Sequence, residues 1–363
     1  MLQNWLKPLP SSLLKMRESL PDAQFGKNML FFGAQLPDLK KAKIALIGVG
    51  EKEANAVRES LYRTIYAFPA GAVADLGNLR KAEASLLIPV VTELLTGRIL
   101  PVIVAGKDDF ARAQFLAYQD AKALINLAAV DERLRFGGAG DVYTPLLKPV
   151  HPLLFNFGLV GLQAHQTESA AAEFLTKNNF DVVRLGKSRS AIEETEPVLR
   201  DADLLAFHLG ALKQSEAPGV ENASPSGYFT EEACQLCRYA GMSDKLTSFG
   251  IYGYRSEFDR DAQTAQTVAQ MIWYFLEGFF SRKNDYPVSK AGLTEYIVEY
   301  RQLNYQLTFW KSIKSGRWWM QVPVATRKKH ERHRLVPCSY LDYQQACREE
   351  LPERLLQAMQ RFS

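Results

Sequence analysis

The sequence has no long apolar run and few cysteines. Its 363 residues contain no stretch near the roughly 18 to 20 apolar residues of a membrane-spanning helix, so no membrane partner is expected. The first fifteen residues mix Asn4, Lys7 and two prolines with apolar side chains, so no secretion signal is expected either. Four cysteines in a chain of this length are too few for a disulfide framework, which predicts a cytoplasmic protein with reduced thiols.

Two of the cysteines, Cys234 and Cys237, form a C-x-x-C pattern. They lie in a run with helical spacing over 230–239, and no second pair completes a zinc-binding set. The pattern therefore favours two buried thiols over a redox or metal site.

The chain also has no large excess of charge of one sign. Its 44 Lys and Arg residues against 40 Asp and Glu give a net charge of +4, which by itself does not imply a nucleic-acid partner. A hydrophobic content of 47%, with 23 Gly and 17 Pro, is typical of a globular protein. The length predicts two domains, or one large α/β sheet with an appendage.

Short apolar runs alternate with longer amphipathic runs along most of the chain. The short runs predict buried strands over 42–49, 100–105, 123–130, 153–162, 181–185, 204–209 and 247–252. The amphipathic runs predict helices over 53–66, 80–96, 110–120, 168–178, 194–201 and 230–240. This order predicts the α/β class, with a mostly parallel sheet between two layers of helices in an αβα arrangement.

The alternation ends after a long helical run over 260–280, and the composition then changes. Tyr, Trp and basic residues crowd 286–334, and a single closing helix is predicted over 340–362. We therefore divide the chain into an N-terminal segment packed on the body (1–40), an α/β domain (41–281) and a basic, aromatic-rich C-terminal extension (282–363).

Four strand ends carry polar residues. In a parallel sheet, ligands bind beyond the carboxyl ends of the strands, so these loops are the candidates for a functional site. They are the runs 102–109, 128–136, 204–213 and 249–254. The third is followed by Ala217-Pro218-Gly219 and by Ser224-Pro225-Ser226-Gly227.

The order and spacing of these motifs over roughly residues 40–281 resemble the arginase or ureohydrolase family. The closest resemblance is to its formimidoylglutamase-like members of the Bacteroidetes type, and the motifs at 217–219 and 224–227 match well. The resemblance implies an arginase-like fold. It also implies a site in which His and Asp side chains hold two bridged manganese ions, which activate a water for attack on a guanidinium or formimino carbon.

The metal-binding positions implied by the resemblance are degenerate. Asp131 alone keeps the family residue, and Asp108 occupies a histidine position. The remaining positions carry Arg133, Arg135, His208, Gly210 and Lys213. A two-manganese cage needs several carboxylates, whereas here several cations enter the same pocket and oppose metal binding electrostatically.

We therefore expect no metal cofactor and a catalytically inert member of the fold that acts as a binding or scaffold protein. In this interpretation Asp108 and Asp131 pair with Arg133 or Lys213 in the former cleft. One variant of this hypothesis makes the cleft a basic site for a small anion, with candidate ligands Lys107, Arg133, Arg135 and Lys213.

A second hypothesis retains enzyme chemistry. Asp108, Asp131 and His208 would hold one manganese ion with open coordination positions, and the protein would hydrolyse C–N bonds of formiminoglutamate-like or guanidino compounds. Asp131→Ala distinguishes the two hypotheses, because it abolishes activity in an enzyme and costs only stability in an inert protein.

The C-terminal extension carries a strong local charge. Eight Lys or Arg lie between Lys311 and Arg334, against the single acid Glu331. Trp318 and Trp319 are expected to anchor the extension to the body, with 327–334 as a solvated turn. The alternatives are a protein partner or, less favoured, a nucleic acid bound through 327–334. The extension resembles one found on family members of the same type, and a homo-oligomer is left open.

Overall fold

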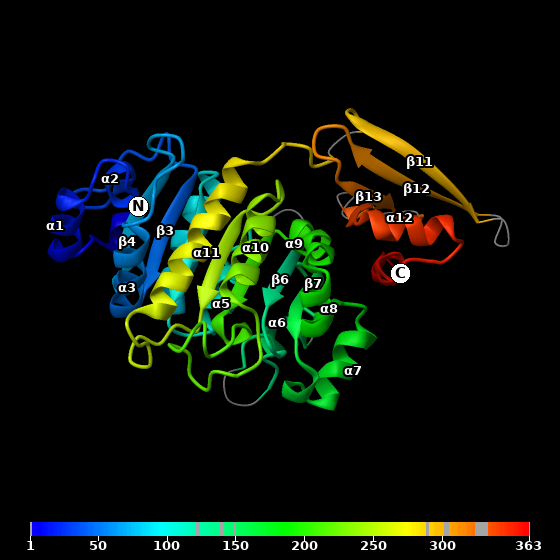
Figure 1. The fold of residues 1–363 in the computed structure, drawn as a ribbon, viewed down its shortest axis with the longest axis horizontal. Helices are drawn as coiled ribbons and strands as arrows, with labels where there is room; N and C mark the ends of the chain where they lie inside the picture. The colour runs from blue at the N-terminus through cyan, green and yellow to red at the C-terminus, as the bar shows by residue number, and fades with distance from the viewer. Residues whose placement is uncertain are drawn as a thin grey trace.

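A computed structural model shows one large sheet flanked by helices and a second, smaller sheet near the C-terminus (Figure 1). The structure describes residues 2–120, 124–137, 141–148, 150–287, 290–300, 305–323 and 333–362. No helix in these ranges is both long and apolar enough to cross a membrane.

The large sheet has ten strands in the order β1-β4-β3-β5-β10-β9-β6-β7-β8, with β2 also paired to β4. All of its pairs are parallel except β1 with β4. Its strands are β1 (Leu6–Lys7), β2 (Leu30–Phe31), β3 (Ile44–Val49), β4 (Val73–Leu79), β5 (Leu100–Ala105), β6 (Ile125–Val130), β7 (Leu154–Leu162), β8 (Asp181–Arg184), β9 (Leu204–His208) and β10 (Ser248–Tyr252). The central strands β3, β5, β10, β9 and β6 are buried along their whole length because helices cover both faces of the sheet.

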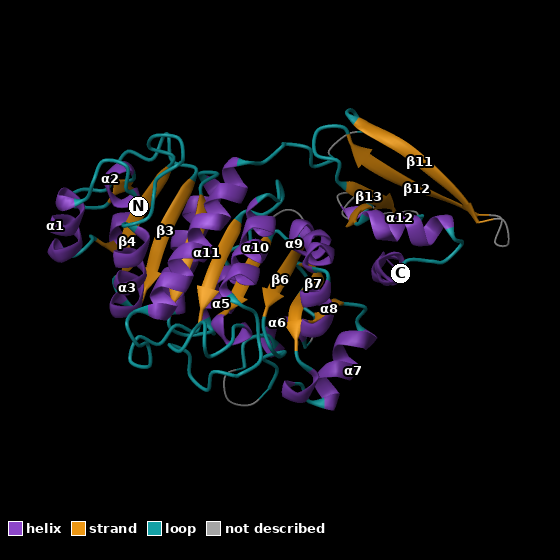
Figure 2. Cartoon of the chain, viewed as in Figure 1, coloured by secondary structure: helices purple, strands orange, loops and turns teal. Residues whose placement is uncertain are grey.

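Helices cover both faces of the large sheet (Figure 2). One face packs against α1 (Ser11–Ser19), α2 (Phe25–Asn28), α3 (Glu51–Leu61), α9 (Glu196–Asp201), α10 (Thr230–Gly241) and α11 (Gln263–Phe280). The other packs against α4 (Ala84–Thr96), α5 (Phe110–Leu116), α6 (Thr144–Leu147) and α7 (Ser169–Lys177). Shorter elements are α8 (Leu185–Ser190), η1 (Leu2–Asn4), η2 (Ala164–Gln166), η3 (Ile192–Thr195) and η4 (Leu209–Ala211). The predicted fold class is confirmed.

Strand β4 was not predicted, because polar residues interrupt its apolar pattern. Asp75 and Asn78 are buried in it, and both accept hydrogen bonds from the buried Arg58 of α3, at 2.8 Å and 2.6 Å. These bonds satisfy the polar groups that would otherwise be costly in a fully buried strand. The pattern of apolar residues alone does not reveal such a strand.

The C-terminal residues form a separate module. Its antiparallel sheet contains β11 (Leu293–Tyr300), β12 (Tyr305–Ser312), β13 (Trp318–Gln321) and β14 (Leu335–Cys338). The prediction of one closing helix is wrong, since the structure has α12 (Tyr340–Cys347) and α13 (Glu353–Phe362). The break has two local causes: Glu349 adopts a left-handed backbone with φ of 63°, and Pro352 directly precedes α13. The antiparallel sheet is not apparent from the apolar pattern of these residues.

Arg200 of α9 connects the body to this module. Its Nη2 donates hydrogen bonds to the carbonyls of Trp318 (3.1 Å) and Cys338 (3.2 Å), and its guanidinium lies 4.4 Å from the ring centre of Trp319. Trp319 thus contacts the body as predicted, whereas the Trp318 side chain belongs to the module's own core. Most of the basic segment 327–334 lies outside the described residues.

Cys234 and Cys237 are both buried in α10, as the sequence analysis predicted. Burial raises the pKa of each thiol, and it raises the pKa of Cys234 to about 12. A thiol that resists ionisation is a poor nucleophile and a poor metal ligand.

Candidate functional site

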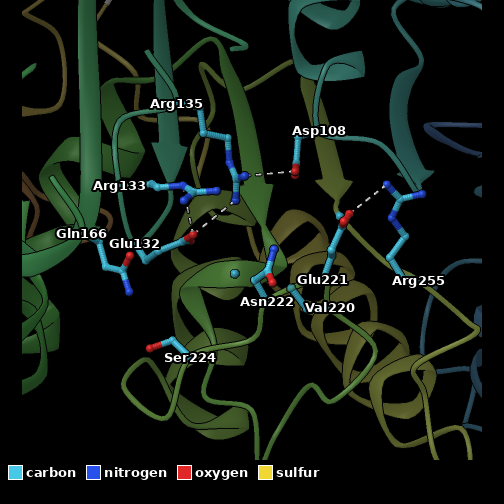
Figure 3. Close-up of a pocket in the computed structure, with 12 residues that line it drawn as sticks. Asp108, Glu132, Arg133, Arg135, Gln166, Val220, Glu221, Asn222, Ser224 and Arg255 are labelled. Atoms are coloured by element: carbon cyan, nitrogen blue, oxygen red, sulfur yellow. Dashed lines mark hydrogen bonds and ion pairs between the residues drawn. The ribbon is translucent and has the colours of Figure 1, made fainter. Parts of the chain in front are cut away.

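The sequence-predicted residues Asp108, Asp131 and His208 meet at the carboxyl edge of the large sheet. Figure 3 shows Asp108 beside Arg135 at this edge. Asp108 follows β5, Asp131 directly follows β6, and His208 is the last residue of β9. These strands are close in the sheet, where the order is β5-β10-β9-β6. Parallel strands bring their carboxyl ends to one edge, which explains why residues about a hundred positions apart come into contact.

The Arg135 guanidinium joins the carboxylates of this cluster. Its Nε lies 2.7 Å from Asp131 Oδ2 and its Nη2 lies 3.2 Å from Asp131 Oδ1. Its Nη1 lies 3.1 Å from Asp108 Oδ2, and its Nη2 lies 3.5 Å from Glu132 Oε1. Arg135 is buried, and these carboxylates raise its pKa further despite the opposing effect of burial. A permanent positive charge therefore lies between the carboxylates.

His208 uses both ring nitrogens within the same cluster. Nδ1 lies 2.8 Å from Asp108 Oδ1, and Nε2 lies 2.7 Å from the hydroxyl of Tyr143. Burial lowers the pKa of His208, so the ring is neutral near pH 7. Nδ1–H then donates to Asp108, and Nε2 accepts from the Tyr143 O–H, whose pKa burial raises. This arrangement leaves no ring lone pair directed at a metal.

Asp108 and Asp131 differ in how readily they take up a proton. Burial opposes ionisation of Asp108, but the hydrogen bond from His208 and the charge of Arg135 outweigh it and lower its pKa to about 2. Asp131 is fully buried, and this burial raises its pKa although Arg135 opposes the effect. Both Asp131 oxygens accept N–H groups, from Arg135 and from the backbone of Glu132, which is the pattern of an ionised carboxylate.

Two glycines allow close packing around these carboxylates. A Cβ added to Gly210 would lie 2.4 Å from Glu132 Oε2, so the Glu132 carboxylate fills the space that a side chain at position 210 would need. Gly253 follows β10 with φ of 89°, and a Cβ there would lie 3.0 Å from Asp108 Oδ1. An Asp at position 210 is thus incompatible with the present position of Glu132.

A pocket opens above this cluster, and the charges that line it balance. Its lining residues are Asp108, Glu132, Arg133, Arg135, Gln166, Gly210, Val220, Glu221, Asn222, Ser224, Gly253 and Arg255 (Figure 3). They include three acids and three arginines. Arg133 and Arg135 both follow Asp131, and Arg133 is the more exposed of the two, with 44% of its side chain accessible. Its Nε lies 3.5 Å from Glu132 Oε1.

Two of the predicted basic residues lie elsewhere. Lys107 is exposed and does not line the pocket. Lys213 lies with Nζ 3.7 Å from the centre of the Phe229 ring, where the cation is stabilised by the aromatic face. The expected pairing of Asp108 and Asp131 with Arg133 or Lys213 is therefore corrected, because Arg135 pairs with both. The cleft lacks the excess of positive charge expected from the sequence.

The side chains present do not fit a divalent metal. Asp108 and Asp131 converge with His208, but Arg135 occupies the carboxylate oxygens and Tyr143 occupies the second histidine nitrogen. In the described part of the chain, no group of three or more His, Cys, Asp or Glu residues is arranged to hold a metal ion. Hard divalent ions need several free oxygen ligands, whereas the oxygens of Asp108 and Asp131 are already paired with Arg135 and His208.

Several residues of the site are not predicted by the sequence pattern. Tyr143 lies beyond a glycine-rich stretch, and no spacing signal connects it with His208. Arg255 and Glu221 form an ion pair of 3.4 Å at the rim, with both side chains partly exposed. Arg255 directly follows the run 249–254, one of the four strand ends with polar residues. The sequence therefore indicates its neighbourhood but not its role.

Comparisons with known proteins agree with this fold. The chain is 24% identical over 234 residues to the formimidoylglutamase of Rhodococcus jostii, spanning 59% of this chain and 72% of that protein. It is 22% identical over 186 residues to the formimidoylglutamase of Staphylococcus haemolyticus, spanning 48% and 60% of the two chains. No family model matches the sequence.

Solved structures show the same architecture. The chain superposes on Trypanosoma cruzi formiminoglutamase with Mn²⁺ at a TM-score of 0.61 and 17% identity, covering 66% of this chain and 94% of that one. For arginase from Bacillus subtilis the TM-score is 0.54 at 16% identity, covering 67% and 99% of the chains. The chain has the arginase-like fold, and the relatives support homology with the formimidoylglutamase and arginase superfamily.

Proposed function

We propose that this chain is an arginase-fold binding protein that does not hydrolyse C–N bonds, because the guanidinium of Arg135 takes the place of a metal centre. One observation carries the proposal: Arg135 bonds to both Asp108 and Asp131, at 3.1 Å and 2.7 Å. The manganese named for the Trypanosoma cruzi enzyme belongs to that protein. In this chain the carboxylates are already neutralised by a group that never loses its proton.

Electrostatics support this proposal. Two unit charges 4 Å apart interact by about 4 kcal/mol at an effective dielectric of 20, and a divalent ion doubles that repulsion. A manganese ion held by Asp108 and Asp131 would face the Arg135 guanidinium, which contacts both carboxylates. It would also have to displace His208 from Tyr143 to gain a nitrogen ligand.

The pocket above Arg135 supports a binding role. Arg133 is partly exposed at its wall, and its contact with Glu132 at 3.5 Å is long for an ion pair. A small anion that displaces this contact would gain a forked guanidinium partner. The small-anion hypothesis thus rests on Arg133 and no longer on Lys107 or Lys213.

A second candidate function is hydrolysis with one manganese ion. It is favoured by the convergence of its three predicted ligands, since His208 lies 2.8 Å from Asp108 and 4.0 Å from Asp131. Such an enzyme would need the Arg135 side chain to move out of the cluster. Its activity would then depend on Asp131.

An activity assay separates the two functions. Purified protein is equilibrated with manganese and tested with formimino and guanidino compounds, beside Asp131→Ala. The binding-protein proposal predicts the same background rate for both proteins. A hydrolytic rate that is lost in a folded Asp131→Ala variant would contradict it and support the one-metal enzyme.

A further inference from the structure

A groove lies between the body and the C-terminal module. The residues that line it are different from those of the Arg135 cluster. Its volume is about 1320 Å³ including the open mouth. One side consists of β8 with α8, η3 and the start of α9, and the other consists of α12, α13 and their connection. Figure 1 shows the module beside this end of the body.

Strand β8 presents its edge to the groove. It is the last strand of the large sheet, and within the described ranges β7 is its sole strand partner. Val182 packs against one core cluster and Val183 against the other, so they project from opposite faces of the sheet. Both nevertheless line the groove, which places the strand edge between them at its wall. Such an edge carries backbone N–H and C=O groups able to pair with another extended segment.

One end of this edge is already closed. Arg361 of α13 donates to the carbonyl of Asn179 at 2.7 Å and lies 3.1 Å from the Asp181 carboxylate. These contacts hold the module against the beginning of β8. The rest of the β8 edge, from Val182 onward, therefore faces a module that these contacts hold in place.

The groove is lined by more acidic than basic side chains, which favours a positively charged ligand. It is lined by the acids Asp181, Glu194, Asp342, Glu350 and Glu353 but by only two cations, Lys187 and Arg354. Asp181 pairs with Arg361, and Asp342 lies 3.4 Å from Arg354. In the described part of the chain, the carboxylates of Glu194, Glu350 and Glu353 have no ion-pair partner. Partial burial raises the pKa of Glu194, although a hydrogen bond with Ser339 and the charge of Arg354 oppose this effect. A further cation beside Glu194 would lower its pKa.

Exposed apolar side chains flank the same groove. Leu341 is 50% exposed and Leu351 is 38% exposed, on the wall opposite Val182 and Val183. An extended segment alternates its side chains between two faces. Such a segment could place apolar groups against the leucines and basic groups against the glutamates.

We infer that this groove binds an extended, lysine- or arginine-containing peptide segment of a partner protein, which adds as a strand to the edge of β8. Main-chain hydrogen bonds to β8 supply part of the affinity, and Glu194, Glu350 and Glu353 select for positive charge. The inference is independent of the function proposed for the Arg135 pocket, since the two sites share no lining residue.

Fluorescence anisotropy on the full chain tests this site. The probe is a labelled ten-residue peptide of alternating valine and lysine. One control has glutamate in place of lysine, and another carries N-methyl groups on alternate backbone nitrogens. We expect saturable binding of the lysine peptide, with binding lost in both controls. Equal binding of the N-methylated peptide would overturn strand addition, and equal binding of the glutamate peptide would overturn the charge preference.

Two matched variants place the binding in the groove. Glu350→Gln combined with Glu353→Gln should weaken the lysine peptide about tenfold by removing two charges. Glu295→Gln removes an exposed charge from β11, outside the groove, and should leave the affinity unchanged. All three substituted positions are exposed, so folding is expected to be preserved. Equal affinity of the lysine peptide for the double variant would overturn the inference.

Discussion

Arg135 and Asp108 come from loops that follow different strands, yet Nη1 of Arg135 lies 3.1 Å from Oδ2 of Asp108. Strands β10 and β9 lie between β5 and β6 in the sheet, so this ion pair spans the width of the site. The same guanidinium also bonds to Asp131. One arginine thus holds together carboxylates that would otherwise repel each other at the bottom of the pocket.

Removal of Arg135 should create a metal site. In Arg135→Ala, the Asp108 and Asp131 carboxylates lose their common cation, and oxygen ligands become available. We expect manganese binding of one ion per chain, measured by electron paramagnetic resonance of the free ion. Arg133→Ala is the matched control, because Arg133 contacts only Glu132 among these acids, and it should bind no manganese. Absence of binding by a folded Arg135→Ala protein would show that the guanidinium does not decide metal exclusion.

Loss of Asp131 should reduce stability. Asp131→Ala removes the carboxylate that makes two bonds to the buried Arg135 and leaves that charge partly unpaired. The free energy of unfolding should fall by about 3 kcal/mol, a typical cost of breaking a buried pair. Urea unfolding followed by circular dichroism measures the change. The paired variant Asp131→Ala with Arg135→Met should recover part of the loss, and a double variant less stable than Asp131→Ala alone would argue against the pair.

The contribution of Asp108 to the free energy of unfolding should depend on pH. Its folded pKa of about 2 lies below the unfolded value of 3.8, so it stabilises the fold above pH 3.8 and loses this effect as the pH falls toward 2. Asp108→Asn keeps an oxygen that accepts from His208 but removes the charge. The variant should be less stable than the original chain by about 2 kcal/mol at pH 6, with a difference that narrows below pH 4. A difference of the same size at pH 2.5 and at pH 6 would contradict the assignment.

Arg200 should hold the C-terminal module to the body. Arg200→Ala removes two hydrogen bonds to module carbonyls and the contact with the Trp319 ring, and it also removes the ion pair with Glu196. We expect the free energy of unfolding to fall by about 3 kcal/mol, and proteolytic cleavage between the body and the module to become faster. Arg189→Ala is the control, because its pair with Glu232 is partly exposed and should contribute less than about 1 kcal/mol. Similar losses in both variants would refute a specific role for Arg200.

Much of the fold could be predicted because most of its central strands are largely apolar and buried. The predicted strands over 100–105 and 247–252 coincide with β5 and β10 to within one residue. β4 escaped prediction because Asp75 is stabilised by Arg58, which follows from the three-dimensional packing. The two closing helices were predicted as one because helical spacing does not register the backbone reversal at Glu349.

The site could be predicted only in part. Parallel topology alone places Asp108, Asp131 and His208 at one edge of the sheet. The choice between Arg133 and Arg135 as the central cation depends on how the loop after β6 folds. There the carbonyl of Arg135 accepts from the backbone nitrogens of Val142 and Tyr143, at 3.1 Å and 3.0 Å. This contact holds the Arg135 backbone and cannot be read from the spacing of the sequence.

The most direct test of the central claim is the manganese content of the unaltered protein. The purified chain is equilibrated with manganese at neutral pH, desalted and analysed for metal per chain. The account predicts a content near zero, because Arg135 already occupies Asp108 and Asp131. One or more equivalents of manganese retained per chain would contradict it.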